Sequence, residues 1–154
     1  MNNKINSSYS KIGDADIRRA EELLGVRLPE SMNKFYLENN GGMPECDVYI
    51  SEGYEYMVNY FMPLILPDVL DDTVIATKRL IDDVSPNWFI PIADDGGELL
   101  YGFSTADEEP GAIYCWITDC ECNEIPEDYN PDDYMVYLSG NIQDFIDGMI
   151  KVED

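Results

Sequence analysis

The chain has 154 residues, of which 9 are lysine or arginine and 32 are aspartate or glutamate, so its formal net charge is −23 with no histidine. A field of this sign repels phosphate and anionic lipid head groups, which argues against nucleic acid and membranes as partners, and it attracts basic proteins. A solvated acidic surface that only keeps the protein soluble, or adapts it to high salt, is the alternative explanation.

A first helix is predicted to end at Gly25, which supplies the left-handed residue of a helix C-terminus. Either Asp14 or Asp16 can cap its N-terminus. Its apolar side chains recur on one side at helical spacing, at Ile17, Ala20, Leu23 and Leu24.

A second helix is predicted directly after the first. Leu28 precedes a proline and is therefore pushed out of the helical region, whereas Pro29 suits the first turn of a helix. Asn-Asn-Gly-Gly at residues 39–42, with Gly41 and Gly42, ends this helix because these residues tolerate positive φ. Its apolar stripe contains Met32, Phe35 and Tyr36.

The middle of the chain predicts a strand and a third helix. Residues 55–66 carry aromatic and β-branched side chains, which favour a strand that stops near Pro63 or Pro67. Asp-Asp-Thr at residues 71–73 forms an N-cap cluster, and the helix that follows ends before Ser85. The residues that repeat at three to four positions in it are Val74, Lys78, Ile81 and Val84.

The second half predicts a β-hairpin, a further strand and a closing helix. Asp-Asp-Gly-Gly at residues 94–97 favours a tight turn between strands at 88–93 and 98–103. Residues 111–116, Gly-Ala-Ile-Tyr-Cys-Trp, predict the next strand. Ser139 or Asn141 can cap the last helix, whose apolar face contains Ile142, Phe145, Ile146, Met149 and Ile150.

Three of these motifs, in this order, resemble the SUKH superfamily, which contains the fungal SMI/KNR-type regulators of cell-wall synthesis and bacterial immunity proteins that neutralise secreted toxins. They are the helix pair, the apolar-Pro-Ile-Ala strand with its acidic Gly-rich turn, and the strand with paired aromatics. We expect the residues that carry the resemblance to be structural, because turns, a cap and a core aromatic explain them. These residues are Gly25, Leu28, Pro29, Gly41, Gly42, Pro91, Gly97 and Trp116.

The resemblance covers about residues 14–150 and implies an α+β fold, with a mostly antiparallel sheet packed with two N-terminal helices, a middle helix and a C-terminal helix. We expect a single domain over residues 1–154, with a short loose segment at about residues 1–10 and a tail at 151–154. One departure is that residues 117–122 contain no histidine, whereas family members often have an acidic, histidine-containing turn there.

Catalysis, cofactors and metal ions are not expected. The absence of histidine removes the commonest general base, and the sequence contains no Gly-x-Ser-x-Gly or phosphate-binding motif. The four cysteines, Cys46, Cys115, Cys120 and Cys122, lack zinc-knuckle spacing and are interpreted as free thiols, with Cys115 in the core. Residues 94–98 lack the alternate carboxylates of an EF-hand calcium loop.

An acidic segment over residues 119–133 is the main candidate binding region. Its prolines and asparagine predict a loop, which is either an ordinary solvated loop or part of an acidic docking surface. Tyr134 and Tyr137 nearby favour a docking surface. The candidate partner-binding residues are Asp94, Asp95, Asp119, Glu121, Glu124, Asp128 and Tyr129.

The resemblance implies a binding function. We expect a cytoplasmic immunity protein that binds and neutralises a cognate toxin domain, and for a basic nuclease its carboxylates would occupy phosphate positions. A regulatory scaffold resembling the fungal relatives is the alternative, and a small-ligand binder that uses Tyr and Trp has less support. The polar N-terminus lacks a secretory signal and the longest apolar run, residues 61–66, is too short to span a membrane. We expect a monomer or a weak homodimer.

Overall fold

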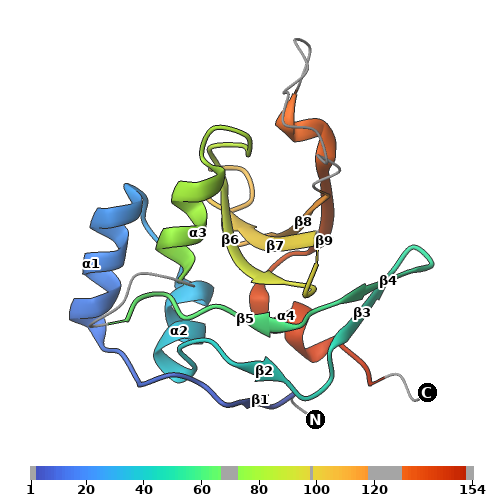
Figure 1. Ribbon diagram of the computed structural model, residues 1–154, viewed down its shortest axis with the longest axis horizontal. Helices are drawn as coiled ribbons and strands as arrows, with labels where there is room; N and C mark the ends of the chain where they lie inside the picture. The colour runs from blue at the N-terminus through green and yellow to red at the C-terminus, as the bar shows by residue number, and fades with distance from the viewer. Residues whose placement is uncertain (1–2, 67–72, 98, 118–129, 152–154) are drawn as a thin grey trace.

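The computed structural model describes residues 3–66, 73–97, 99–117 and 130–151. Within these residues it contains the helices α1 (Asp14–Leu24), α2 (Glu30–Glu38), α3 (Val74–Ile81) and α4 (Ile142–Asp147), and the 3-10 helix η1 (Pro131–Tyr134). Its strands are β1 (Ile5–Asn6), β2 (Met43–Pro44), β3 (Val48–Ser51), β4 (Tyr54–Met57), β5 (Tyr60–Phe61), β6 (Phe89–Asp94), β7 (Leu99–Ser104), β8 (Ile113–Ile117) and β9 (Met135–Ser139) (Figure 1).

One antiparallel sheet organises the described part of the chain. Its strand order is β5-β6-β7-β8-β9, so every strand pairs with the next one in the sequence. The pairs β1-β2 and β3-β4 form two separate two-stranded sheets (Figure 1). The structure therefore confirms the predicted α+β fold, with a mostly antiparallel sheet, two N-terminal helices, a middle helix and a C-terminal helix.

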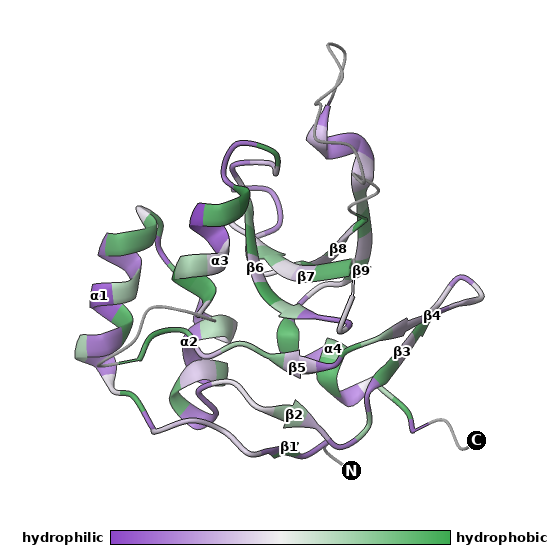
Figure 2. Ribbon diagram, in the orientation of Figure 1, coloured by the Kyte–Doolittle hydropathy of each residue, from purple (hydrophilic) through white to green (hydrophobic). Residues whose placement is uncertain are grey.

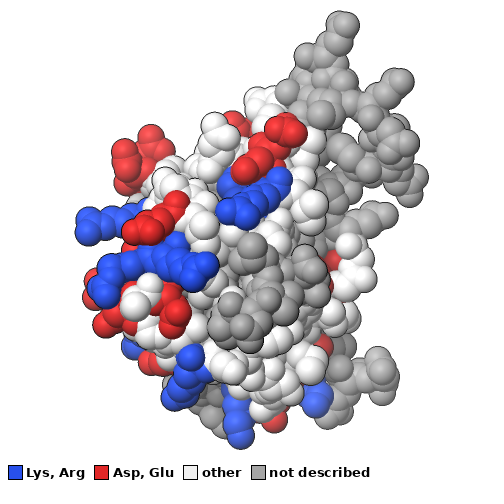
Figure 3. Space-filling model, turned by 60° about the vertical axis from the view of Figure 1, so that its left-hand side comes forward, with Lys and Arg blue, Asp and Glu red and all other residues white. Residues whose placement is uncertain are grey.

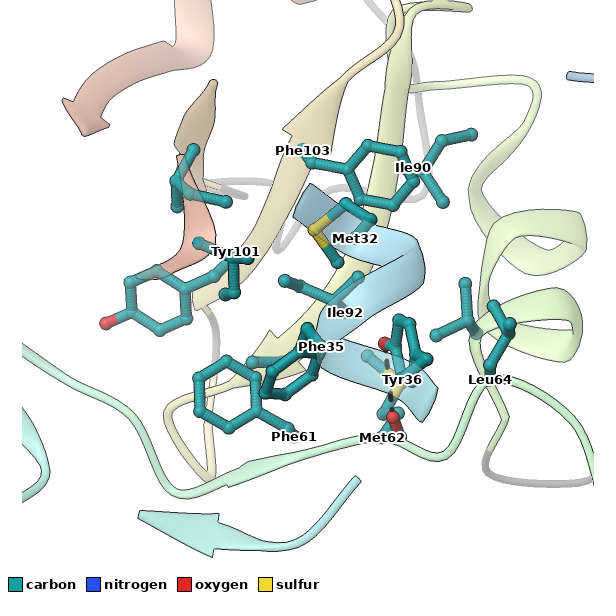
Figure 4. Packing of buried hydrophobic residues seen from close by; sticks show 14 of the residues in the cluster. Met32, Phe35, Tyr36, Phe61, Met62, Leu64, Ile90, Ile92, Tyr101 and Phe103 are labelled. Carbon is teal, nitrogen blue, oxygen red and sulfur yellow. Dashed lines mark hydrogen bonds between the residues drawn. The ribbon is translucent and has the colours of Figure 1, made fainter. Parts of the chain in front are cut away.

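The main core lies between α2 and the sheet. The side chains of α2 face those of β5, β6 and β7 (Figure 4). The rings of Phe35 and Phe61 pack edge to face across this layer, with 5.3 Å between their centroids. Burial of each large apolar side chain contributes roughly 1.5–3 kcal/mol, so this layer holds helix and sheet together. Its labelled members include Met32, Phe35, Tyr36, Phe61, Ile92, Tyr101 and Phe103.

The helix ends largely follow their predicted signals. Gly25 has φ 73° at the C-terminus of α1, and the side chains of Thr73 and Asn141 cap α3 and α4. The predicted cap of α1 is wrong, because Gly13 is the N-cap residue and Asp16 lies in the first turn, where its carboxylate accepts the Gly13 N–H at 3.0 Å.

Each helix has one buried face. In Figure 2 the ribbons of α1 and α3 alternate between hydrophilic and hydrophobic bands, as an amphipathic helix requires. Leu23 was expected on the apolar stripe of α1 but is exposed, whereas Ile17 and Ala20 are buried. Among the described helices, none is long and apolar enough to cross a membrane.

The prediction of one strand over residues 55–66 is wrong. Two strands, β4 and β5, lie in this stretch, and between them the buried Val58 donates its N–H to the carbonyl of Asp47 at 2.7 Å. The N–H of Asn59 then bonds to the carbonyl of Asp94 at 2.7 Å, so the chain changes partner and enters the main sheet. Strands β1, β2, β3 and β9 and helix η1 were not predicted.

Part of the N-terminal segment is ordered, which differs from the loose segment expected over residues 1–10. Strand β1 pairs with β2. The side-chain amide of Asn3 donates to the carbonyl of Cys46 at 2.6 Å and accepts the N–H of Cys46 at 2.8 Å. The polar sequence of this segment does not predict the arrangement, because the residues that bind the segment lie about forty positions further along the chain.

Asn40 joins three segments of the chain. Its side chain is almost completely buried, and its amide nitrogen donates to the carbonyls of Ser10 and Ile65, both at 3.1 Å. Its amide oxygen accepts the N–H of Leu64 at 2.9 Å. A buried amide with these partners is satisfied, and its loss would leave several backbone groups without a partner.

We predict that Gly102→Ala destabilises the fold by about 3 kcal/mol, because a Cβ atom at this position would lie 2.3 Å from the carbonyl oxygen of Ile90 and 2.7 Å from the ring of Phe89. The free energy of unfolding in urea measures the effect. Gly140→Ala is the matched control, since its Cβ would have only the Tyr137 hydroxyl nearby at 3.6 Å. Equal effects of the two substitutions would contradict the close approach of β6 and β7 at Gly102.

Candidate protein-docking surface

The main sheet has two chemically different faces. Side chains alternate along a strand, so Ile113 and Cys115 of β8 join the main core while Tyr114 and Trp116 point to the opposite side. The same alternation places Tyr137 of β9 beside Tyr114, its partner in the register. We call the side that carries these aromatic residues the outer face. The buried apolar side chains of all four described α-helices belong to the main core and not to the outer face.

Three aromatic side chains lie in a row on the outer face. The ring centroids of Trp88 and Tyr114 are 4.9 Å apart and those of Tyr114 and Tyr137 are 5.6 Å apart, both in edge-to-face geometry. We call Trp88, Tyr114 and Tyr137 the aromatic row. Tyr137 is 52% exposed, and beneath the row the rings of Phe89 and Trp116 are buried. Rigid aromatic side chains of this kind supply most of the binding energy in many protein interfaces.

Two carboxylates hold the aromatic row. The indole N–H of Trp88 donates to Asp132 Oδ1 at 2.9 Å, and the hydroxyl of Tyr114 donates to the carboxylate of Glu109. Burial, and then the hydrogen bond to Glu109, raise the pKa of Tyr114 well above its ordinary value. The two hydrogen bonds orient both rings. The row presents aromatic surface with negative charge at its edges.

The predicted partner-binding residues Asp94 and Asp95 lie at the turn between β6 and β7. Asp94 Oδ1 accepts the N–H of Gly96 at 2.8 Å, and Asp95 Oδ1 accepts the N–H groups of Gly97 at 2.8 Å and Leu99 at 3.0 Å. Asx turns of this kind explain why aspartates occupy the turn. One oxygen of each carboxylate is thus used by the backbone, so a binding role for Asp94 and Asp95 stays a prediction.

The other five candidate residues, Asp119, Glu121, Glu124, Asp128 and Tyr129, lie outside the described residues. The residues that flank this segment are described. Ile117 pairs with Leu99, directly after the β6–β7 turn, and Asp132 contacts Trp88. The described residues on either side of the undescribed stretch 118–129 thus lie near the aspartate turn and near the aromatic row.

Most of this surface was missed by the sequence analysis. Trp88 and Tyr114 were assigned to strands without a role, and the contacts of Glu109 and Asp132 join positions that are far apart in the sequence or lie in loops. The alternation of Ile113, Tyr114 and Cys115 was the one local signal, because it divides apolar and amphipathic side chains between two faces. Without β9, the position of Tyr137 beside Tyr114 could not be inferred.

Basic residues are distributed unevenly. Figure 3 brings the side of α1 forward and shows lysine and arginine side chains gathered among acidic ones over α1 and α3. Arg18, Arg19 and Arg27 are exposed there. No lysine or arginine occurs between Arg79 and Lys151, the stretch that contains the whole aromatic row. The strands and loops of the outer face therefore contribute negative charge without any compensating cation.

The described cysteines are free thiols. Cys115 is fully buried in the core, as predicted, and burial and then the charge of Asp95 raise its pKa to about 12. Cys46 is half-buried and also free. Within the described ranges, no three acidic or cysteine side chains are placed so as to hold a metal ion.

Several motif residues occupy turns and close contacts. Gly41 has φ 80°, and a Cβ atom there would lie 2.7 Å from the carbonyl oxygen of Phe61. Leu28 is buried and donates its N–H to Glu21 Oε2 at 2.8 Å, which links the first two helices. Pro91 lies where the β6–β7 register shifts, and the ring of Trp116 packs near Phe89 at 6.4 Å. The local backbone and packing account for these positions.

A comparison with protein-family models gives one match. The model described as the SMI1/KNR4 family (SUKH-1) matches residues 11–148, which is most of the chain and includes both the helix pair and the strands of the outer face. No curated protein matches the chain.

We predict that Glu109→Gln lowers the pKa of Tyr114, because an amide stabilises the neutral phenol less than a carboxylate does. The raised pKa adds stability that is complete below tyrosine's ordinary value of 10.0 and is lost as the pH rises above it, so the variant should lose less stability in that range. Titration of the tyrosine ring signals by NMR measures the shift. Glu108→Gln is the control, and an equal shift in both variants would contradict the specific contact.

Proposed function

The chain belongs to the SMI1/KNR4 family (SUKH-1), and from this membership we propose that it is a non-enzymatic binding protein that docks a partner protein on the outer face of its sheet. The family supports roles in protein interaction, either as an immunity protein or as an SMI1-like regulator. Within that range we propose an immunity protein that neutralises a toxin domain with a basic surface.

The aromatic row carries this proposal. Three aromatic side chains at fixed separations, with Tyr137 more than half exposed, form the kind of rigid contact area that anchors a protein interface. Hydrogen bonds to Glu109 and Asp132 fix two of the rings before a partner arrives, which lowers the entropy lost on binding. These contacts support a binding surface.

Charge would set the rate and orientation of binding. The field of a protein with net charge −23 accelerates the approach of a basic partner, and the cation-free stretch between Arg79 and Lys151 directs that partner toward the outer face. Carboxylates at this face would cover the cationic surface with which a nuclease holds phosphates. The aromatic row would then supply most of the affinity by excluding water from the centre of the contact.

We predict that the double variant Trp88→Ala, Tyr137→Ala fails to capture the partner that the wild-type protein captures from its native lysate. Loss of two central anchors should weaken binding about a thousandfold, at about 2 kcal/mol for each anchor. Pull-down with mass spectrometry identifies the partner, and co-expression of that partner with each variant measures rescue of cell growth. Tyr9→Ala, an exposed tyrosine outside the outer face, is the control.

One result would contradict the docking surface and another would contradict the immunity function. Equal capture by the double variant and the control would show that the aromatic row does not bind the partner. Capture of several unrelated proteins, none of them toxic to cells, would favour a regulatory scaffold instead.

We also predict that replacing Asp119, Glu121 and Glu124 by lysine slows association with the basic partner and leaves the melting temperature nearly unchanged, because long-range attraction acts on the association rate. Surface plasmon resonance at several salt concentrations measures both rates. The control replaces Glu22, Glu38 and Glu45 by lysine, which changes the net charge by the same amount. These three residues are exposed and lie outside the outer face. Equal slowing in both sets would show that only the net charge matters.

A further inference from the structure

The hairpin formed by β3 and β4 projects from the body of the molecule (Figure 1). Neither of its strands pairs with a strand of the main sheet. Glu52 and Gly53 form its two-residue turn and have φ 51° and 85°, the left-handed pair that matches the twist of a hairpin. Its base is fixed, because the hydroxyl of Tyr49 donates to the carbonyl of Leu138 at 2.8 Å. The hairpin is therefore a rigid arm.

Large apolar side chains of this arm are exposed. Tyr54 is 69% exposed, the highest value among its aromatic residues, and Ile50 and Met57 are about half exposed. Ile50 and Met57 lie on one face of the pair, and Tyr54 lies on the other. Apolar surface on both faces of a projecting hairpin is unusual for a segment that contacts only water.

The register shows that β4 has a free edge. Tyr54 closes the turn opposite Ser51, so the backbone groups of Glu55 and Met57 point away from β3. The carbonyl of Met57 confirms this direction, since it accepts the hydroxyl of Tyr101 at 2.6 Å. Among the described strands β4 pairs only with β3. The N–H and C=O of Glu55 and the N–H of Met57 are thus presented to an incoming strand, and Tyr101 marks the inner end of this edge.

The charges on the arm select its occupant. Asp47, Glu52 and Glu55 lie on or beside the hairpin, and neither β3 nor β4 contains a lysine or arginine. A second copy of this chain, with net charge −23, would be repelled. A basic residue opposite Glu55 and an apolar residue beside Met57 or Tyr54 would both be stabilised.

We propose that the free edge of β4 binds an extended basic segment of a partner protein as an added antiparallel or parallel strand. Backbone hydrogen bonds at Glu55 would give affinity, and alternating basic and apolar side chains would give selectivity. The proposal rests on the protein-binding function proposed above, but it uses a surface separate from the aromatic row.

The test uses a synthetic peptide of about ten residues, the length of a long strand, in which lysine and valine alternate. We expect it to bind the wild-type protein and to slow hydrogen exchange of the Glu55 amide at least about tenfold in NMR spectra. The comparison peptide has the same sequence with N-methyl groups on all of its central residues, so it keeps the charge and loses the backbone donors of both of its edges. Equal binding of the two peptides would overturn strand addition, because charge alone would then explain it.

Glu55→Pro gives a second test. Proline removes the outward N–H at a position that makes no bond to β3, so the hairpin should remain and peptide binding should be lost. Glu55→Gln, which keeps the N–H, should retain the exchange protection. If the proline variant unfolds, the N-methylated peptide on the wild-type protein decides the question. Retained binding by a folded proline variant would overturn the proposal.

The double variant Trp88→Ala, Tyr137→Ala separates this proposal from the proposed function. It should bind the peptide as the wild-type protein does, even where it no longer captures the partner. Loss of peptide binding in this variant would overturn the assignment to β4. A wild-type protein that binds the peptide at β4 but captures no toxin would support the strand site and contradict the immunity function.

Discussion

The alternation of side chains across β7 and β8 is the constraint on which both halves of the molecule depend. Ile113 and Cys115 face the main core, whereas Tyr114 and Trp116 face the opposite side. A shift of one residue in the pairing of β8 would exchange these two sets of side chains. Gly102, the partner of Tyr114 in this register, also allows β6 to approach β7 closely, since any side chain there would meet the carbonyl of Ile90. The core and the aromatic row are therefore two results of one strand alignment.

The sequence predicts the fold well wherever the signal is local. Gly25, Thr73 and Asn141 act within one helical turn of their own positions. The α+β fold, which the resemblance to the SUKH superfamily implied, is confirmed. Prediction failed where partners are distant. The chain changes from β4 to β5 because Val58 bonds to Asp47 and Asn59 bonds to Asp94. An alternation pattern cannot show where a strand exchanges one partner for another.

The candidate site was likewise predicted only where its signal is local. The acidic character of the second half could be read directly from the sequence, but the aromatic row needs three strands and two loops to bring Trp88, Tyr114 and Tyr137 together. Asp94 and Asp95 show a further limit of the sequence, because a carboxylate that stabilises its own turn looks the same there as one that binds a partner, and a binding role for these two residues stays a prediction. Five of the candidate residues, over 119–129, lie outside the described residues.

Asn40 has a consequence for how the protein folds. Its amide bonds to Ser10 and Ile65 and accepts from Leu64, so three segments separated by more than twenty residues must arrive together to satisfy one buried side chain. A partly folded chain that lacked any of them would contain an unpaired polar group in an apolar environment. Intermediates of this kind are therefore destabilised. The N-terminal segment that contains Ser10, the helix α2 and the segment after β5 form and melt as one cooperative unit.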